Sequence, residues 1–238
     1  MEKPIVDVMN LNQGIIRLLN DEGCRIFGFA DLTLLPPEYE DARRGASVAI
    51  VMGEPYGTAE GIREMLDGKS DKFGNESGAT FEPLNRYKAA VKGFLKAARY
   101  KSDIKYLNTT ITFKMLATLA GIGWIGRCAV LTTREWGPSL RLSAIATNAP
   151  LACGTPITKS LCPPDCFACA NICPVNAIKK GVLWERFPDR TGVHRDEFFD
   201  AKACRIGRRQ RDPKAQGEPI CGLCICACPF TKKALETY

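Results

Sequence analysis

The order of apolar and polar residues along the first half of the chain is typical of a protein that mixes helices with a sheet. Ile15 and Leu19 recur at helical spacing ahead of Gly23, which predicts a helix over the second decade of the chain. Apolar runs at residues 24–32 and 46–53 predict strands. The second run is continuously apolar, as expected for a strand that is buried on both faces.

A longer helix is predicted over residues 81–101, because its apolar residues share one side and its lysines the other. Residues 112–120 predict a further helix that runs directly into a glycine-rich stretch. After it, residues 128–133 and 140–147 resemble strands, and we expect residues 134–139 to join them as a hairpin. The apolar positions of the long helix are Leu84, Tyr87, Val91, Phe94, Leu95 and Ala98.

The glycine-rich stretch, LAGIGWIGRCAV at residues 119–130, contains G-x-G-x-x-G at Gly121, Gly123 and Gly126. A dinucleotide loop needs a strand before the glycines, a helix after them and an acidic residue about 20 positions further on. The predicted order is the reverse, no acidic residue stands at that distance, and Trp124 would crowd a pyrophosphate. We therefore interpret the stretch as a tight helix-to-strand turn, in which glycine permits positive φ or the close approach of a flat cofactor.

Neither a membrane span nor a targeting signal is visible in the sequence. No apolar run approaches the length needed to cross a bilayer, and the first residues lack the basic and apolar regions of a secretory signal. We therefore expect a cytoplasmic protein without a membrane partner. Because the cytoplasm keeps thiols reduced, its cysteines are expected to serve metal or redox chemistry rather than disulfides.

The 12 cysteines are unevenly distributed over the 238 residues of the chain. Nine of them lie between Cys162 and Cys228. Cys24, Cys128 and Cys153 are scattered, and we predict that they are buried apolar residues rather than ligands.

This change of composition near residue 150 predicts two domains and an α+β fold. Residues 1–150 have the pattern of an α/β domain that would hold a cofactor or a substrate. Residues 151–238 are so rich in loops that we expect them to depend on metal for their structure.

Two cysteine blocks share one spacing. Residues 162–174 read CPPDCFACANICP, and residues 221–229 read CGLCICACP. Both contain C-x₂-C-x₃-C-P, the end of the bacterial ferredoxin run, in which the cysteine before proline binds the other cluster. Cys162 and Cys204 stand further upstream than the first ligand of that run and are predicted to replace it.

Applied to both blocks, this crossing rule predicts two [4Fe–4S] clusters. Zinc in a Cys₄ site is the alternative, but the doubled C-x₃-C-P favours iron and sulfur. Cys226 is one thiol more than the pattern requires and is an alternative to Cys224. The predicted ligands are Cys162, Cys166, Cys169 and Cys228 for the first cluster, and Cys173, Cys204, Cys221 and Cys224 for the second.

The formal net charge of the chain is +7, and its distribution indicates which kinds of partner the protein binds. Two oxidised clusters with four thiolates each would bring about −2 apiece, which leaves about +3. Basic residues are concentrated at 202–214, where they would bind either RNA phosphates or an acidic electron donor. Because no stacking aromatic residues are interleaved, we expect an electron-donor protein rather than RNA.

The string at residues 120–151, AGIGWIGRCAVLTTREWGPSLRLSAIATNAPL, followed by the two cysteine blocks, resembles epoxyqueuosine reductases and the related reductive dehalogenases. The resemblance covers roughly the last 130 residues. It implies a nitroreductase-like N-terminal domain that binds cobalamin, followed by a two-cluster ferredoxin-like domain. It also implies that the turn formed by Gly121, Gly123, Trp124, Ile125 and Gly126 lies against the corrin.

The sequence departs from this family at one position that matters for chemistry. Asn108 stands near the place of an aspartate that looks like the family's proton donor, and an amide cannot donate a proton as a carboxylic acid does. The chain also ends ten residues after Cys228, so we expect a short member without the C-terminal helical-repeat domain. An activity other than tRNA epoxide reduction is therefore expected, and no catalytic residue is identified.

Two functions follow from these expectations. The first is an iron–sulfur oxidoreductase that relays single electrons from both clusters to a cofactor, with cobalamin as the candidate, or to a small-molecule substrate. The alternative is a partner protein that transfers electrons or handles a corrinoid without turnover of its own. The large N-terminal part favours the reductase, since an electron carrier alone does not need it.

Overall fold

The computed structural model describes residues 8–69, 71–103, 111–185, 193–211 and 221–237. Its contacts divide the chain into two units, and each unit combines segments that are separate in the sequence. The sheet unit is drawn from residues 1–54, 81–122 and 142–157, and the cysteine unit from 55–80, 123–141 and 158–238. These units are not the two domains that we predict on either side of residue 150, and that domain boundary stays a prediction.

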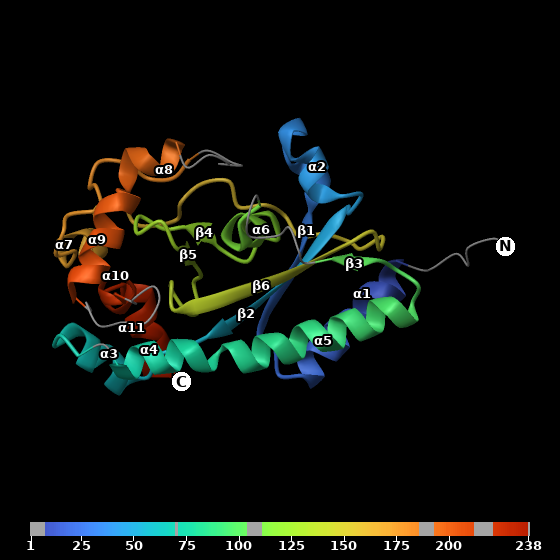
Figure 1. Cartoon of the computed structure of the whole chain (residues 1–238), viewed down its shortest axis with the longest axis horizontal. Helices are drawn as coiled ribbons and strands as arrows, with labels where there is room; N and C mark the ends of the chain where they lie inside the picture. The colour runs from blue at the N-terminus through green and yellow to red at the C-terminus, as the bar shows by residue number, and fades with distance from the viewer. Residues whose placement is uncertain (1–7, 70, 104–110, 186–192, 212–220, 238) are drawn as a thin grey trace. The chain divides into compact units, whose positions relative to one another are not determined.

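A four-stranded sheet forms the centre of the sheet unit (Figure 1), and it confirms the three predicted strands at 24–32, 46–53 and 140–147. The order is β1 (Ile26–Asp31), β2 (Val48–Pro55), β6 (Leu140–Thr147) and β3 (Ser102–Asp103). β1 and β2 are antiparallel, and so are β3 and β6. The residues of β2 from Val48 to Gly53 are all buried, as its continuous apolar run predicts.

Helices cover both faces of this sheet. α1 (Val8–Asp21) and α5 (Phe81–Ala97) pack their apolar sides against Phe29 and the neighbouring strands, which confirms the two helices predicted from apolar spacing. The opposite face of β1 meets the end of α6 (Phe113–Leu119), since a Cβ at Gly28 would lie 3.2 Å from Ala120. Successive residues of a strand face opposite sides, so the sheet lies between two helical layers.

The predicted hairpin over residues 128–147 is wrong. β5 (Leu131–Thr132) pairs with β4 (Trp124–Ile125), whereas β6 belongs to the four-stranded sheet. The pattern identified strand-like segments correctly, but an apolar run does not specify which strand it will pair with. In the place of the predicted hairpin connection, a β-bridge between Thr133 and Gly137 closes a short loop over residues 133–137.

The cysteine unit consists of short helices, the two-stranded sheet of β4 and β5, and connecting segments (Figure 1). Ile62 of α3 and Phe73 of α4 pack against Leu223 and Cys226 of α10. The helices of this unit are α3 (Ala59–Leu66), α4 (Asp71–Ala79), α7 (Ala168–Asn171), α8 (Val193–Phe198), α9 (Ala201–Arg211), α10 (Leu223–Cys226) and α11 (Pro229–Thr237).

The remaining elements of the sheet unit lie between β1 and β2: η1 (Leu32–Leu34), η2 (Pro37–Tyr39) and α2 (Glu40–Arg43). The mixture of helices and sheet confirms the α+β character predicted from the sequence. Within the described part of the chain, no helix combines the length and the apolar character that a membrane crossing needs.

Candidate metal centre

The two cysteine blocks, about 50 residues apart in the sequence, meet in the cysteine unit. α7 carries Cys169 of the first block and α10 carries Cys224 of the second, and the two helices are in contact. Cys169, Cys173 and Cys224 pack in one apolar cluster together with Cys128. The fold therefore brings thiols of both blocks to one place.

One group of neighbouring thiols combines the first block with the last cysteine of the second. Burial raises the pKa of Cys169, and the nearby sulfurs of Cys128, Cys162, Cys228 and Cys166 raise it further. Burial likewise raises the pKa of Cys228 to about 12, with further contributions from Cys128 and Cys162, while the backbone amides of Phe230 and Thr231 oppose the shift. Cys228 thus lies beside the cysteines of the first block.

A second group combines the last cysteine of the first block with the upstream cysteines of the second. Burial raises the pKa of Cys204; Arg208 opposes this shift, and Cys221 and Cys173 add to it. The backbone amide of Ala177 donates a hydrogen bond to the Cys173 sulfur at 3.3 Å. The proximity of these thiols corresponds to the crossed arrangement that the spacing predicts for the second cluster.

Cys224 and Cys226 occupy different surroundings. Cys224 packs in the apolar cluster that also contains Cys173. Cys226 is fully buried in a separate apolar cluster with Met65 and Phe73, and burial raises its pKa to about 12. The fold does not separate the two alternatives, because Cys224 lies in a cluster with Cys173 and Cys226 lies near Cys221; the choice of Cys224 as the ligand stays a prediction.

The atoms of this region that could bind a metal are cysteine sulfurs. Thiolates are the ligands of iron–sulfur clusters and of structural zinc, and binding requires their deprotonation. The raised pKa values show that closely packed, buried thiols resist carrying charge without a cation to neutralise it. In the described residues, no three His, Cys, Asp or Glu side chains form a group that fits a single metal ion.

Of the scattered cysteines, Cys24 and Cys128 are buried, as predicted, and Cys153 is partly buried. Cys24 packs in the core of the sheet unit, where burial raises its pKa to about 11. Cys128 is different, because a hydrogen bond with Cys224 and then burial raise its pKa well above the ordinary value. The sequence does not indicate this location, since no spacing pattern connects Cys128 to the two blocks.

Trp124 points its polar edge at a predicted cluster ligand. It is 1% exposed, and its Nε1 donates a hydrogen bond to Cys162 Sγ at 3.4 Å. Its ring also packs edge-to-face on Phe230, with the centroids 5.4 Å apart. Hydrogen bonds to ligating sulfurs influence the potential of a cluster. The assignment of Trp124 to a corrin site stays a prediction.

Arg127 stabilises the loop of the first cysteine block through hydrogen bonds to its backbone. It is 2% exposed, and its guanidinium donates to the carbonyl oxygens of Pro164 at 3.0 Å, Cys166 at 3.1 Å and also Lys180. The same group lies 4.7 Å from the ring centre of Phe167. Arg127 was not among the residues expected to matter, although a single charge inside the apolar run WIGRCAVL is a signal for a buried, fully bonded side chain.

The three glycines of the turn are required by the protein's own packing. Gly121 has φ +73°, and a Cβ there would lie 2.6 Å from the carbonyl oxygen of Thr155. A Cβ at Gly123 or Gly126 would collide with Thr132. The tight helix-to-strand turn is therefore confirmed, because α6 ends at Leu119 just before Gly121 and β4 begins at Trp124, directly after Gly123. Contact of residues 121–126 with a cofactor stays a prediction.

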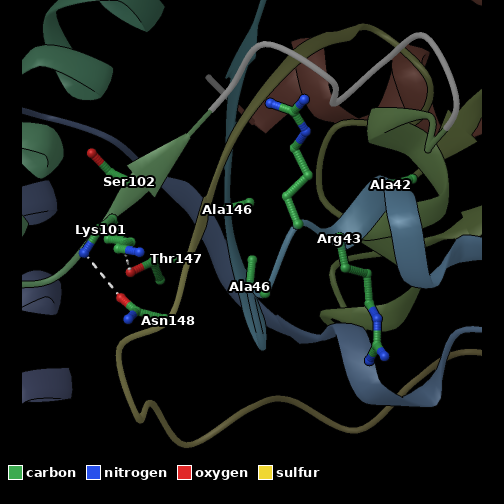
Figure 2. A pocket seen from close by; sticks show the side chains of 10 residues that line it. Ala42, Arg43, Ala46, Lys101, Ser102, Ala146, Thr147 and Asn148 are labelled. Carbon is green, nitrogen blue, oxygen red and sulfur yellow. Dashed lines mark hydrogen bonds between the residues drawn. The ribbon is translucent and has the colours of Figure 1, made fainter.

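The sheet unit contains a cavity of about 340 Å³ (Figure 2). Arg43 lines it, but its guanidinium donates to the Leu32 carbonyl and pairs with Glu40. Thr147 donates to the carbonyl of Lys101 at 2.7 Å. This volume is at the lower end for small-molecule sites and does not fit an entire corrinoid. None of the turn residues 121–126 lines it. Asn108, expected near the proton donor's place, lies outside the described residues.

No family model matches the chain. Over 124 residues it is 33% identical to a tetrachloroethene reductive dehalogenase from Sulfurospirillum multivorans, a match that covers 49% of this chain and 23% of the relative. It is 23% identical over 168 residues to an epoxyqueuosine reductase from Shewanella oneidensis, covering 71% of this chain and 37% of the relative. The predicted superfamily is confirmed. The chain spans less than half the length of these curated superfamily relatives.

Solved structures of the superfamily have a similar fold. An epoxyqueuosine reductase with a tRNA-Tyr stem loop matches 95% of this chain and 66% of its own, with a TM-score of 0.59 and 18% identity. A reductive dehalogenase, whose structure suggests a mechanism for B12-dependent dehalogenation, matches 99% of this chain and 35% of its own, with a TM-score of 0.59 and 17% identity. The stem loop does not support our expectation that RNA is not a partner.

Proposed function

We propose that this protein is an iron–sulfur oxidoreductase in which two [4Fe–4S] clusters relay single electrons to a second cofactor or to a substrate. The observation that carries the proposal is the crossed neighbourhood of the thiols. Cys228 of the second block lies near Cys162 and Cys169, and Cys204 lies near both Cys173 of the first block and Cys221 of the second. Two-cluster ferredoxins use this arrangement.

The surroundings of the thiols suit two anionic clusters. When bound, such clusters supply one-electron transfer. Trp124 and the amide of Ala177 each donate a hydrogen bond to a sulfur of a different group. Arg127 holds the first block's loop with a buried positive charge. These residues would orient the ligands and favour the reduced, more negative state of each cluster.

We extend the proposal to cobalamin as the electron acceptor. The support is the superfamily, which includes a reductive dehalogenase of similar fold described as B12-dependent. The cavity in Figure 2 does not support cobalamin binding, because its volume is too small for a corrinoid. RNA also becomes a candidate partner, since an epoxyqueuosine reductase of similar fold was solved with a tRNA stem loop.

Anaerobic purification followed by iron, sulfide and cobalt analysis tests the cofactor content. We expect about eight irons and eight sulfides per chain, the content of two cubanes. The reduced protein is then mixed with tetrachloroethene, or with an epoxyqueuosine-modified stem loop, while cluster absorbance is followed. Reoxidation by either probe supports a reductase. Zinc in place of iron and sulfide would refute the cluster proposal, whereas full clusters without reoxidation by any substrate would favour an electron carrier.

A further inference from the structure

A basic hollow of about 620 Å³ lies on the cysteine unit, beside α8 and α9. Seven of the residues that line it are charged, and five of these are cationic. No predicted cluster ligand lines it directly. The cationic residues are Lys179, Arg195, Lys202, Arg205 and Arg208, and the carboxylates are Asp196 and Asp200.

Part of this charge is balanced within the hollow. Arg195 pairs with Asp196 at 2.9 Å, and Lys179 Nζ donates to the Asp196 carbonyl at 2.7 Å. Asp200 accepts a hydrogen bond from the amide of Ala203 at 2.8 Å and so caps the beginning of α9. Both carboxylates are therefore engaged with the fold, and the charge that faces outward from α9 is positive.

Lys202 and Arg205 carry that positive charge. Both are exposed, and they lie three residues apart on α9, which places them on one side of the helix. Arg208 continues the same row one turn further on. A row of cations on a hollow surface attracts an acidic partner and speeds its encounter with the site.

The same helix carries Cys204, a predicted ligand of the second cluster. Cys204 is partly buried and lies between Lys202 and Arg205, four residues before Arg208. Residues four apart on a helix are neighbours, so the hollow lies within one helical turn of this sulfur. Electrons arriving here would have a short path to the cluster that Cys204 is proposed to bind.

We propose that this basic hollow docks an acidic electron-carrier protein that reduces the second cluster. The inference rests on the proposed function. In each encounter the reduced carrier loses one electron and the cluster gains it, with no bond formed or broken. A protein is favoured over RNA because the hollow lies next to a redox ligand and RNA supplies no electron.

The test is anaerobic stopped-flow reduction of the cluster-loaded protein by reduced flavodoxin, an acidic electron carrier, at low and high salt. Lys202→Glu/Arg205→Glu should slow reduction at low salt about tenfold and remove most of its salt dependence. Lys232→Glu/Lys233→Glu changes the net charge equally at two exposed lysines of α11 and should leave the rate within about twofold.

Titanium(III) citrate, a small reductant, separates this inference from the proposed function. If it reduces both clusters in every variant, the clusters are intact and the flavodoxin rates report docking alone. Equal flavodoxin rates in the wild type and Lys202→Glu/Arg205→Glu, or equal slowing in both variants, would overturn the docking site. The docking site would also be overturned if binding of an anticodon stem-loop RNA depended on Lys202 and Arg205 while reduction by flavodoxin did not.

Discussion

At the scale of single residues, the stretch from Trp124 to Cys128 does more than form a turn. Trp124 donates to the Cys162 sulfur, Arg127 fastens the loop around Cys166, and Cys128 forms a hydrogen bond with Cys224. The glycine spacing predicted the turn correctly. It did not predict these contacts, because they join residues that are 38 to 96 positions apart.

Trp124→Phe should shift the midpoint potential of one cluster to a more negative value. Phenylalanine keeps most of the packing against Phe230 but removes the N–H donor to Cys162, and that hydrogen bond favours the more negative, reduced state. A bond worth about 1 kcal/mol corresponds to about 40 mV for one electron. Potentiometric titration followed by electron paramagnetic resonance measures the shift.

Trp136→Phe is the matched control, because it makes the same substitution in the same unit, in the loop where the amide of Trp136 donates to Thr133 Oγ1 at 3.0 Å. Its potentials should equal those of the wild type. A Trp124→Phe protein with unchanged potentials would show that the indole does not influence the cluster.

At the scale of elements, periodicity predicted the individual segments but not their pairing. The helical spacing of Ile15 and Leu19 located α1, and the apolar side of α5 was predicted residue by residue. The hairpin over residues 128–147 was wrong, because β5 pairs with the short β4 that no apolar alternation marks. Two residues are too few to produce a recognisable pattern.

The loop of the first cysteine block has no regular structure apart from α7, so we expect its stability to depend on Arg127. Arg127→Met keeps the apolar stem and removes the donors to the carbonyls of Pro164 and Cys166, so that the charge-assisted hydrogen bonds of this loop are lost. The expected loss is about 3 kcal/mol of unfolding free energy. Thermal unfolding of the anaerobic, cluster-loaded protein measures it, together with the rate of iron loss to a chelator.

Arg63→Met, at an exposed position of α3, is the control and should change stability by less than about 0.5 kcal/mol. If Arg127→Met unfolds like the wild type and keeps its iron equally long, the carbonyl contacts do not stabilise the loop.

At the scale of the whole molecule, cysteine spacing predicts the candidate site without reference to the fold, because the spacing encodes ligand geometry, and the ligand assignment stays a prediction. The crossed grouping of Cys228 with Cys169, and of Cys173 with Cys204, corresponds to the rule applied to the sequence alone. The basic hollow was predictable only as a charge-rich segment at 202–214, and residues 212–214 lie outside the described residues. Residues of α8 and α9 line it together, and composition does not specify how two helices are placed.

The measurement that tests the crossed arrangement most directly is the iron content of two double variants, purified anaerobically. Cys169→Ala/Cys228→Ala removes two ligands that we assign to one cluster, although they come from different blocks. Cys169→Ala/Cys173→Ala removes two ligands from one block that we assign to different clusters. Cys24→Ala, which removes a buried thiol in the core of the sheet unit, is the control and should keep about eight irons.

We predict about four irons per chain in Cys169→Ala/Cys228→Ala, and close to none in Cys169→Ala/Cys173→Ala, because the first loses one cluster and the second loses both. The opposite result would be about four irons in Cys169→Ala/Cys173→Ala and close to none in Cys169→Ala/Cys228→Ala. It would show that each block binds its own cluster, and it would contradict the crossed arrangement.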